Sequence, residues 1–492
     1  MKSNGMEGLV LNEPFIFELQ GAQECGIDIP EFDVEMQDPK NNIPNDLLRK
    51  EIEGLPDLTE PQVIRHYTRL STWNYSLDGG FYPLGSCTMK YNPKINEAAA
   101  AMPGFANAHP YLPDNLSQGM LKLLFELQND LTEISGLHTT CLHPAAGSHG
   151  ELLGMLLIRA FHEDKGDLNR TKIIIPDSAH GTNPASAAVA GLQPIELKSN
   201  SKGLIDFKKL EEILDETVAG IMITNPNTCG VFESDIVEIC ELIHKKGGLV
   251  YMDGANMNAL VAKAKPGDMG VDVLHYNTHK TFSTPHGGGG PGAGPVSVSE
   301  KLVPFLPKPV LEKDGDMIKW NYDIPKSIGQ VRSFYGNVGV LVRAYTYIKT
   351  LGALGLRDMT ETAVLNANYM KKRLSEHFNI PFADGHCMHE VLLSENGLEE
   401  LGITTMDVAK GLIENGFHPP TVYFPLIVQG AMLIEPTETE SKGTMDDFID
   451  TMIALKGTAP DQLHDFPAKT VVGRVDEVLA ARKPKLRWNK DA

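Results

Sequence analysis

Lys280 and Asp253 are the two residues whose types and spacing most directly indicate chemistry. Asp253 ends the nearly all-apolar run 249–253, where an isolated carboxylate is costly unless it meets a cation. Lys280 follows the next apolar run, 27 residues later. An amine near a buried acid suits a lysine that forms a Schiff base, and the acid suits protonation of a pyridine nitrogen, as in pyridoxal phosphate sites. A single lysine is more often a solvated side chain, so this interpretation depends on its neighbours.

Three turns carry small or polar residues where apolar patterns begin or end. Gly147, Ser148 and His149 open a helical pattern, where bare backbone amides suit a phosphate and where Ser148 as an ordinary N-cap is the alternative. His180 suits aromatic stacking or proton transfer, or a hydrogen-bonded turn. The turn 223–230 is rich in short polar side chains. These segments therefore join Lys280 and Asp253 as candidates.

A glycine run and two histidine spacings suggest other ligands, but each lacks the necessary context. The run 286–295 contains a G-x-G-x-x-G pattern, yet a proline interrupts it and a strand-like segment follows, so it is no dinucleotide fingerprint. His275 and His279 are four residues apart, and His386 and His389 three. Neither pair has the acid or cysteine pattern of a zinc site, so we expect no metal ion.

Composition narrows the class of protein further. The 492 residues include 44 Lys and Arg against 64 Asp and Glu, a formal charge of −20. Such a surface repels phosphodiester backbones and anionic lipids, so we expect no nucleic acid and no membrane as partner. Six cysteines without a C-x-x-C pattern indicate reduced thiols. With no 18-residue apolar run and no signal peptide in view, we expect a soluble, cytoplasmic protein.

The elements that must position these residues alternate along the chain. The runs predicted as strands are 172–176, 220–224, 248–252, 271–275 and 294–298, and the helical patterns are 117–134, 152–162, 210–217 and 235–246. Strand and helix at this rhythm predict βαβ crossovers and a mainly parallel sheet covered by helices. Because ligands bind outside the carboxyl ends of such strands, Asp253 and Lys280 should share one edge.

Three regions are expected. Residues 1–115 form a proline-broken arm, residues 116–335 the large cofactor-binding domain, and residues 336–492 a smaller α+β domain with helices at 338–351, 361–377 and 445–454. The arm lacks the periodicity of a core of its own, yet it contains apolar residues, namely Leu9, Leu11, Phe15, Ile16, Phe17 and Leu19. We therefore expect the arm to pack on a second chain.

Five segments together resemble the glycine cleavage system P-protein family of pyridoxal phosphate-dependent glycine decarboxylases. They are residues 277–292 (NTHKTFSTPHGGGGPG), 83–90 (PLGSCTMK), 180–185 (HGTNPA), 230–233 (GVFE) and 435–440 (EPTETE). The length resembles subunit 2 of the split form, in which two related chains replace one long polypeptide. The resemblance implies an α/β protein of fold type I, similar to aspartate aminotransferase, with a large mainly parallel-sheet domain and a smaller C-terminal α+β domain.

The same resemblance implies roles for single residues. Lys280 would form the Schiff base, Asp253 would face the pyridine nitrogen, and His180 would stack on the ring. The other implied contacts are Gly147, Ser148, His149 and Thr278 at the phosphate, Thr228 near the 3-hydroxyl, and Cys87 with Thr88 at the substrate. For Cys87, simple packing remains an equal alternative.

The implied activity is that of an oxidoreductase, decarboxylating glycine and passing the aminomethyl group to the lipoyl arm of the H-protein. The implied partners are glycine, glycine dehydrogenase subunit 1 and the lipoylated H-protein, in a heterotetramer. Two alternatives stay open: a non-catalytic partner half that holds no cofactor, and another fold type I enzyme such as a cysteine desulfurase. The desulfurase would need a mobile nucleophilic cysteine after the lysine, and Cys387 is the candidate.

Overall fold

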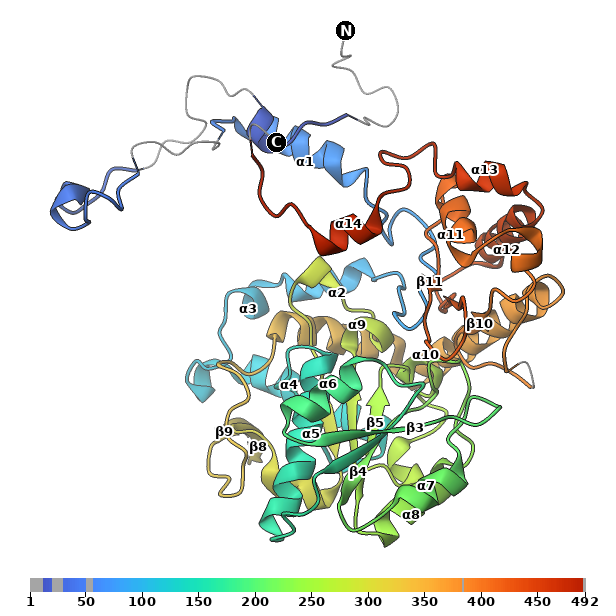
Figure 1. Cartoon of the computed structure of the whole chain (residues 1–492). Coiled ribbons are helices and arrows are strands. Elements are labelled where there is room, and N and C mark those ends of the chain that lie inside the picture. Colours follow the sequence, from blue (N-terminus) through green and yellow to red (C-terminus); the bar gives the residue numbers. More distant parts are fainter. Residues whose placement is uncertain (1–11, 20–29, 50–55, 383–384, 490–492) are drawn as a thin grey trace. The chain divides into compact units, whose positions relative to one another are not determined.

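The computed structural model describes residues 12–19, 30–49, 56–382 and 385–489 (Figure 1). The chain divides into two compact units, residues 77–464 and the combination of residues 1–76 with 465–492. Leu9 and Leu11 of the expected arm lie outside the described residues. The domain boundaries at 115 and 335 stay a prediction. Among the described helices, none has the length and apolar composition of a bilayer span.

A seven-stranded sheet forms the centre of the larger unit, in the order β1-β7-β6-β5-β4-β2-β3. Its strands are β1 (Thr139–Cys141), β2 (Lys172–Pro176), β3 (Gln193–Leu197), β4 (Val218–Thr224), β5 (Leu249–Gly254), β6 (Val273–Tyr276) and β7 (Val296–Val298). Strands β3, β2, β4, β5 and β6 run parallel, and β7 is antiparallel to both β6 and β1. The expected mainly parallel sheet is therefore confirmed.

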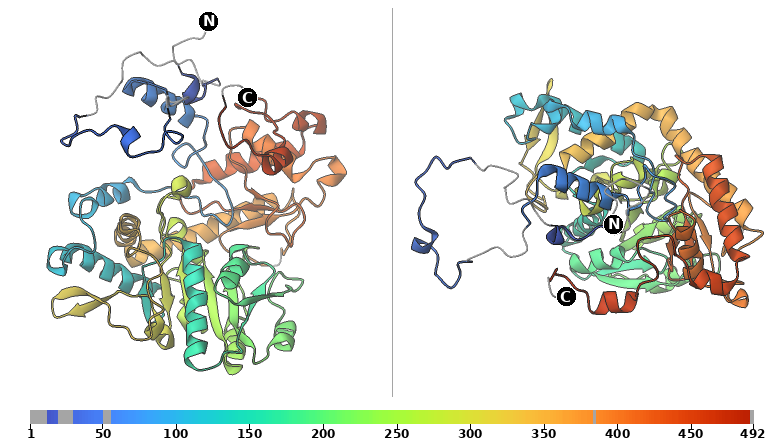
Figure 2. Two further views of the ribbon diagram at one scale, coloured as in Figure 1. Left: turned by 60° about the vertical axis from the view of Figure 1, so that its left-hand side comes forward. Right: turned by 90° about the horizontal axis from the view of Figure 1, so that it is seen from above.

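Helices cover both faces of this sheet (Figure 2). They are α4 (Gln118–Ser135), α5 (Gly147–Asp164), α6 (Thr182–Val189), α7 (Phe207–Ile213), α8 (Ile236–Lys245) and α10 (Val338–Leu374). Successive residues of a strand face opposite sides of the sheet. Tyr251 packs in the cluster with α5, whereas Val250 and Met252 pack in the cluster with α4, α8 and α10. This two-sided burial explains why the strands are apolar throughout.

The remaining elements of this unit come before, between or after the strands of this sheet in the sequence. They are α2 (Lys94–Ala100), α3 (Pro103–Ala106), α9 (Thr278–Thr281), α11 (Thr405–Glu414), α12 (Lys442–Lys456), α13 (Pro460–His464), β8 (Val310–Asp314), β9 (Met317–Asn321), β10 (Val391–Leu393), β11 (Thr421–Val422) and β12 (Met432–Ile434). Strands β8 and β9 pair as a hairpin, and β10, β12 and β11 form an antiparallel sheet.

Several elements differ from the sequence-based expectation. Strands β1 and β3 were not predicted, because β1 is three residues long and β3 is largely exposed. Helix α6 was not predicted either. The two helices expected at 338–351 and 361–377 are one element, α10, interrupted at Gly352, where φ is 61°. Helix α5 begins at Gly147, five residues earlier than expected, so the phosphate-binding turn is part of the helix itself.

The other unit contains α1 (Glu60–Ser71) and α14 (Glu477–Arg482). Glu13 joins its segment to α1, since its carboxylate accepts hydrogen bonds from Arg69 and lies 2.8 Å from His66 Nδ1. The rings of Phe17 and Trp488 lie 5.3 Å apart, so residues near both ends of the chain meet in this unit.

Candidate active site

Lys280 and Asp253 extend from neighbouring strands at the same edge of the sheet. Asp253 lies in β5 and pairs in register with His275 of β6, and Lys280 follows β6 on the short helix α9. Both side chains are largely buried, with 3% of Asp253 and 9% of Lys280 exposed. The expected juxtaposition of acid and amine at the carboxyl ends of parallel strands is therefore present.

The Asp253 carboxylate is held in one orientation by three neighbours. It accepts hydrogen bonds from the Ala255 amide (2.9 Å) and from Asn183 Nδ2 (3.1 Å), and His275 Nε2 lies 3.4 Å away. Burial opposes ionisation, but the charges of His275 and Lys280 together with these hydrogen bonds hold the pKa of Asp253 below its ordinary value. The group is therefore an anion, as the partner of a pyridinium must be.

A second buried carboxylate, that of Glu151, is linked to Asp253 through hydrogen bonds of Asn183. Asn183 Nδ2 also donates to Glu151 (3.0 Å), which accepts further bonds from the hydroxyls of Thr182 (2.9 Å) and Ser186 (3.3 Å). Asn183 thus bridges Asp253 and Glu151. Sequence reasoning missed both Asn183 and Glu151, although Asn183 lies in the segment 180–185 that carried the resemblance.

The N-terminus of α5 provides an anion site. Its first internal bond runs from the Gly150 amide to Ala146, so among the described residues the amides of Gly147, Ser148 and His149 have no acceptor. A Cβ on Gly147 would lie 1.7 Å from Asn277 Oδ1, so only glycine fits there. The N-cap is Ala146 without a side-chain bond, so the alternative that Ser148 caps the helix is wrong.

The side chains expected at the phosphate and ring are placed as follows. His149 Nδ1 accepts from the Ala145 amide (3.1 Å), so this ring folds back on its own turn. The Thr278 hydroxyl donates to the Ala293 carbonyl (3.1 Å), and the Thr228 hydroxyl donates to the Ser178 carbonyl. His180 is exposed and accepts from the Thr182 amide (3.2 Å). Their contacts with a cofactor stay predictions.

Asn225 is a further candidate at the end of β4. It is fully buried, its Oδ1 accepts from the Glu233 amide (3.0 Å), and its Nδ2 has no partner among the described residues. The preceding residue, Thr224, pairs in register with Asp253. A buried donor without an acceptor is unfavourable, so Nδ2 is available for a bound group. The polar turn 223–230 gave the signal, but the sequence could not single out this residue.

The turn 85–88 brings Cys87 and Thr88 to this edge. The Thr88 amide (2.8 Å) and hydroxyl (2.6 Å) donate to Glu435, and the Ser86 amide donates to Glu390 (2.8 Å). Burial raises the pKa of Cys87 to about 11, with Lys280 acting in the opposite direction, so the thiol is protonated at neutral pH. Both the substrate contact and the simple packing of Cys87 stay predictions.

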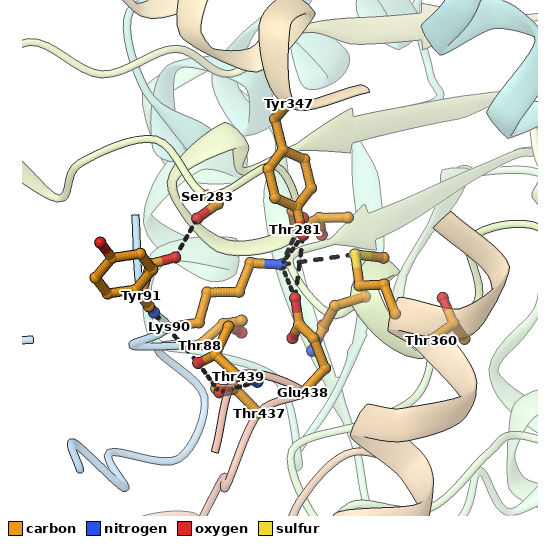
Figure 3. Close-up of polar contacts among 12 residues, drawn as sticks. Thr88, Lys90, Tyr91, Thr281, Ser283, Tyr347, Thr360, Thr437, Glu438 and Thr439 are labelled. Carbon is orange, nitrogen blue, oxygen red and sulfur yellow. Dashed lines mark hydrogen bonds and ion pairs between the residues drawn. The ribbon is translucent and has the colours of Figure 1, made fainter. Parts of the chain in front are cut away.

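Lys90 links this turn to the lysine-bearing helix, as Figure 3 shows. Its fully buried ammonium group donates to the Thr281 carbonyl (2.8 Å), to the Tyr347 hydroxyl (3.1 Å) and to Glu438 (2.7 Å). Burial opposes the charge, but Glu438 and Tyr347 raise the pKa of Lys90 above its ordinary value. Sequence reasoning did not single out Lys90, although it ends the segment 83–90.

The residues at this edge fit pyridoxal phosphate. The free amides of α5 suit the phosphate, the anionic Asp253 suits the pyridinium, Asn225 offers an unpaired donor, and Lys280 offers an amine. The fold and this site define a pyridoxal phosphate-dependent enzyme of fold type I.

Two family models match the chain: "Glycine cleavage system P-protein" over residues 35–316 and "Glycine dehydrogenase, C-terminal domain" over residues 359–467. The chain therefore belongs to the glycine cleavage system P-protein family. It is 54% identical, over 97% of its length, to proteins named "Probable glycine dehydrogenase (decarboxylating) subunit 2" from Halalkalibacterium halodurans and Listeria monocytogenes, covering 99% and 98% of those proteins.

Solved structures support the fold. An inhibitor-bound glycine decarboxylase (P-protein) of the glycine cleavage system aligns with a TM-score of 0.72 at 22% identity, over 84% of this chain and 94% of that one. A cysteine desulfurase from Thermococcus onnurineus aligns with a TM-score of 0.61 at 15% identity, over 77% and 96%. The fold type I prediction is therefore confirmed.

Proposed function

We propose that this chain is the catalytic subunit of a glycine decarboxylase that transfers the aminomethyl group of glycine to the lipoyl arm of an H-protein. The observation that carries the proposal is the placement of Lys280 and Asp253 at one sheet edge, beside the free amides of α5. The near full-length similarity to proteins named as subunit 2 of glycine dehydrogenase supports it.

Each residue then has a task. The amides of Gly147, Ser148 and His149 hold the phosphate, and Asp253, kept anionic by its surroundings, holds the proton of the pyridine nitrogen. Lys280 anchors the cofactor through its amine. Pyridoxal phosphate, when bound, supplies an electron sink that stabilises the negative charge left as CO₂ departs.

The other predicted contacts complete the pocket. In the proposal, His180 covers the ring, Thr228 and Asn225 lie near its 3-hydroxyl, and Thr278 supports the phosphate turn. Cys87 and Thr88 line the substrate side next to Lys280.

We propose subunit 1 of the split enzyme and the lipoylated H-protein as partners, in a heterotetramer with two chains of each kind. The exposed apolar residues before α1 support a second chain: Phe15 is 67% exposed, and Phe32, Val34 and Met36 are exposed to a similar degree. The glycines 287–290 and 292 are proposed as a flexible wall through which the lipoyl arm enters. Of these, Gly287, Gly288 and Gly289 have positive φ and open space around them.

The alternatives are less favoured. A non-catalytic half would not require both Lys280 and Asp253 at the site. A desulfurase would require a mobile cysteine, whereas Cys387 is buried, its amide donates to Asn368 (3.1 Å), and burial raises the pKa of its thiol to about 12.

The test is exchange of labelled bicarbonate into glycine by the chain co-purified with its partner, with lipoylated H-protein present. We expect exchange that depends on Lys280. A complex that binds pyridoxal phosphate but exchanges no bicarbonate, or that releases sulfur from cysteine, would contradict the proposal.

A further inference from the structure

Glu390 and Glu435 are two buried acids to which the proposed mechanism gives no task. Glu390 immediately precedes β10 and Glu435 immediately follows β12, and the adjacent residues Val391 and Ile434 pair in register. The antiparallel ladder therefore sets the two glutamates opposite each other. Two carboxylates at directly opposite positions would repel each other if both were ionised, so packing alone does not explain this arrangement.

The hydrogen bonds around the pair leave part of it unsatisfied. Glu435 accepts from the Thr88 amide and hydroxyl and from Asn258 Nδ2 (3.2 Å). Glu390 Oε2 accepts from the Ser86 amide, but its Oε1 has no partner among the described residues. Both glutamates are 0% exposed. A bound group with N–H donors would therefore satisfy the free carboxylate oxygen of Glu390.

His389 is a third buried side chain near the two carboxylates. Its Nε2 lies 3.8 Å from Glu390 Oε2 and 4.0 Å from Glu435 Oε1, too far for hydrogen bonds. Both ring nitrogens lack a partner within the described chain, although the side chain is fully buried. Burial and the charge of Lys280 lower the pKa of His389 to about 3, so the ring is neutral and does not balance the acids.

Lys280 is the cation whose charge acts on both acids. Burial and Glu435 raise the pKa of Glu390 well above its ordinary value, with Lys280 acting in the opposite direction. Burial likewise raises the pKa of Glu435, against the hydrogen bonds of Thr88 and the charge of Lys280. Ionisation of one carboxyl therefore opposes ionisation of the other, and the pair favours holding a proton.

We propose that Glu390 and Glu435 form an acid pair that binds the ammonium group of the incoming amino acid beside Lys280 and holds the proton passing between the two amines. This inference rests on the proposed function, in which the substrate amine must approach the carbon that the Lys280 amine has bonded. Acids on which the charge of the Lys280 amine acts are then placed to act on the substrate amine as well.

The proton step balances without a change of oxidation state. Two N–H bonds break at the substrate nitrogen and two form at the Lys280 nitrogen, and the acid pair carries each proton in turn. The first N–H bond to break gives a carboxyl O–H bond and frees the substrate's lone pair, and that O–H bond then breaks as an N–H bond forms on Lys280. The second proton follows the same route, so that Lys280 is released as an ammonium group. The acid pair ends in its starting state.

Two small probes separate this role from general support of the pocket. Methylamine carries an ammonium group at neutral pH, whereas methoxyamine is uncharged and has no proton to give up before it attacks. Both are mixed with the pyridoxal phosphate-loaded complex, and cofactor absorbance is followed by stopped flow. We expect E390Q and E435Q to slow methylamine at least about tenfold and methoxyamine by less than about threefold.

Glu233→Gln is the matched control. Glu233 is a buried glutamate that accepts from the Ile205 amide (2.8 Å), and burial raises its pKa without a contribution from Lys280. We expect wild-type rates with both probes. Unchanged methylamine rates in E390Q and E435Q, or equal losses with both probes, would overturn the acid pair.

Aspartate variants keep the inference testable if the glutamine variants do not fold. E390D and E435D retain the carboxylate on a side chain shorter by one methylene group. They should lower the rate of the methylamine reaction selectively, but less than the glutamine variants do. Equal rates to wild type would refute the pair. Absence of a borohydride-stable adduct at Lys280 in the wild type would instead contradict the proposed function, so the two failures are distinguishable.

Discussion

The buried ammonium group of Lys90 donates a 2.8 Å hydrogen bond to the carbonyl of Thr281, the residue after Lys280 (Figure 3). The same group forms a 2.7 Å ion pair with Glu438, three residues beyond Glu435. Lys90 therefore ties the turn 85–88, the lysine-bearing helix α9 and the segment after β12 to one another. It is a positioning residue, since it contacts the elements that carry the reacting groups.

Lys90→Met should destabilise the fold strongly, because it removes the buried ammonium group and leaves the largely buried carboxylate of Glu438 without its counterion. Breaking one side of a buried pair costs about 3–5 kcal/mol, measured as the free energy of unfolding in urea. Lys90→Met combined with Glu438→Gln should recover part of the loss. Lys94→Met is the control, because its partner Asp78 is exposed and the free energy should hardly change. Equal effects of the two lysine variants would contradict the role of Lys90.

Lys280→Ala should abolish the covalent attachment of pyridoxal phosphate, because Lys280 supplies the amine. The measurement is borohydride reduction followed by peptide mass mapping, and the wild type should give one adduct, at Lys280. A stable adduct on another lysine in the variant would show that the assignment is wrong.

Asp253→Ala should retain some cofactor through the phosphate site but lose decarboxylation at least about 100-fold, because the pyridinium loses its anionic partner. Bound cofactor is measured by absorbance and turnover by bicarbonate exchange. Asp272→Ala is a useful comparison, since this buried aspartate pairs with His244 (2.7 Å) and Lys301 (2.6 Å) away from Lys280. It should lower stability while the folded fraction keeps its turnover. Near-normal turnover in Asp253→Ala would refute the electron-sink role.

Gly147→Ala should weaken pyridoxal phosphate binding, because the new methyl group would collide with Asn277 and displace the turn whose amides hold the phosphate. Equilibrium dialysis of the cofactor measures the effect. Gly119→Ala in α4 meets open space and replaces a helical glycine, so it should raise stability by up to about 1 kcal/mol and leave binding unchanged. Unaltered affinity in Gly147→Ala would contradict the phosphate site.

Deletion of residues 1–50 should separate this chain from its partner on size exclusion, because the deletion removes the exposed apolar residues Phe15, Phe32, Val34 and Met36. An obligate interface buries more than about 2,000 Å², and such a loss should abolish association. Circular dichroism should show the sheet retained. A truncated chain that still assembles and exchanges bicarbonate would contradict the arm hypothesis.

Local patterns were sufficient for strands β2, β4, β5, β6 and β7 and for the placement of Asp253 and Lys280. The apolar run at β2 predicted that strand with its bounds, and the order of β5, β6 and α9 predicted that Asp253 and Lys280 would share an edge. Local patterns could not predict the acid pair, because Glu390 and Glu435 become neighbours only through the pairing of β10 with β12. Asn225 and Lys90 were missed for a related reason, since their burial depends on distant segments.

The hydrogen bonds from Thr88 to Glu435 span 347 residues of sequence. A chain emerging from the ribosome displays Asp253 and Lys280 well before Glu435. In the proposal, amine exchange needs both glutamates, so it requires a chain that extends past β12 and has closed this very long loop, which has an entropic cost.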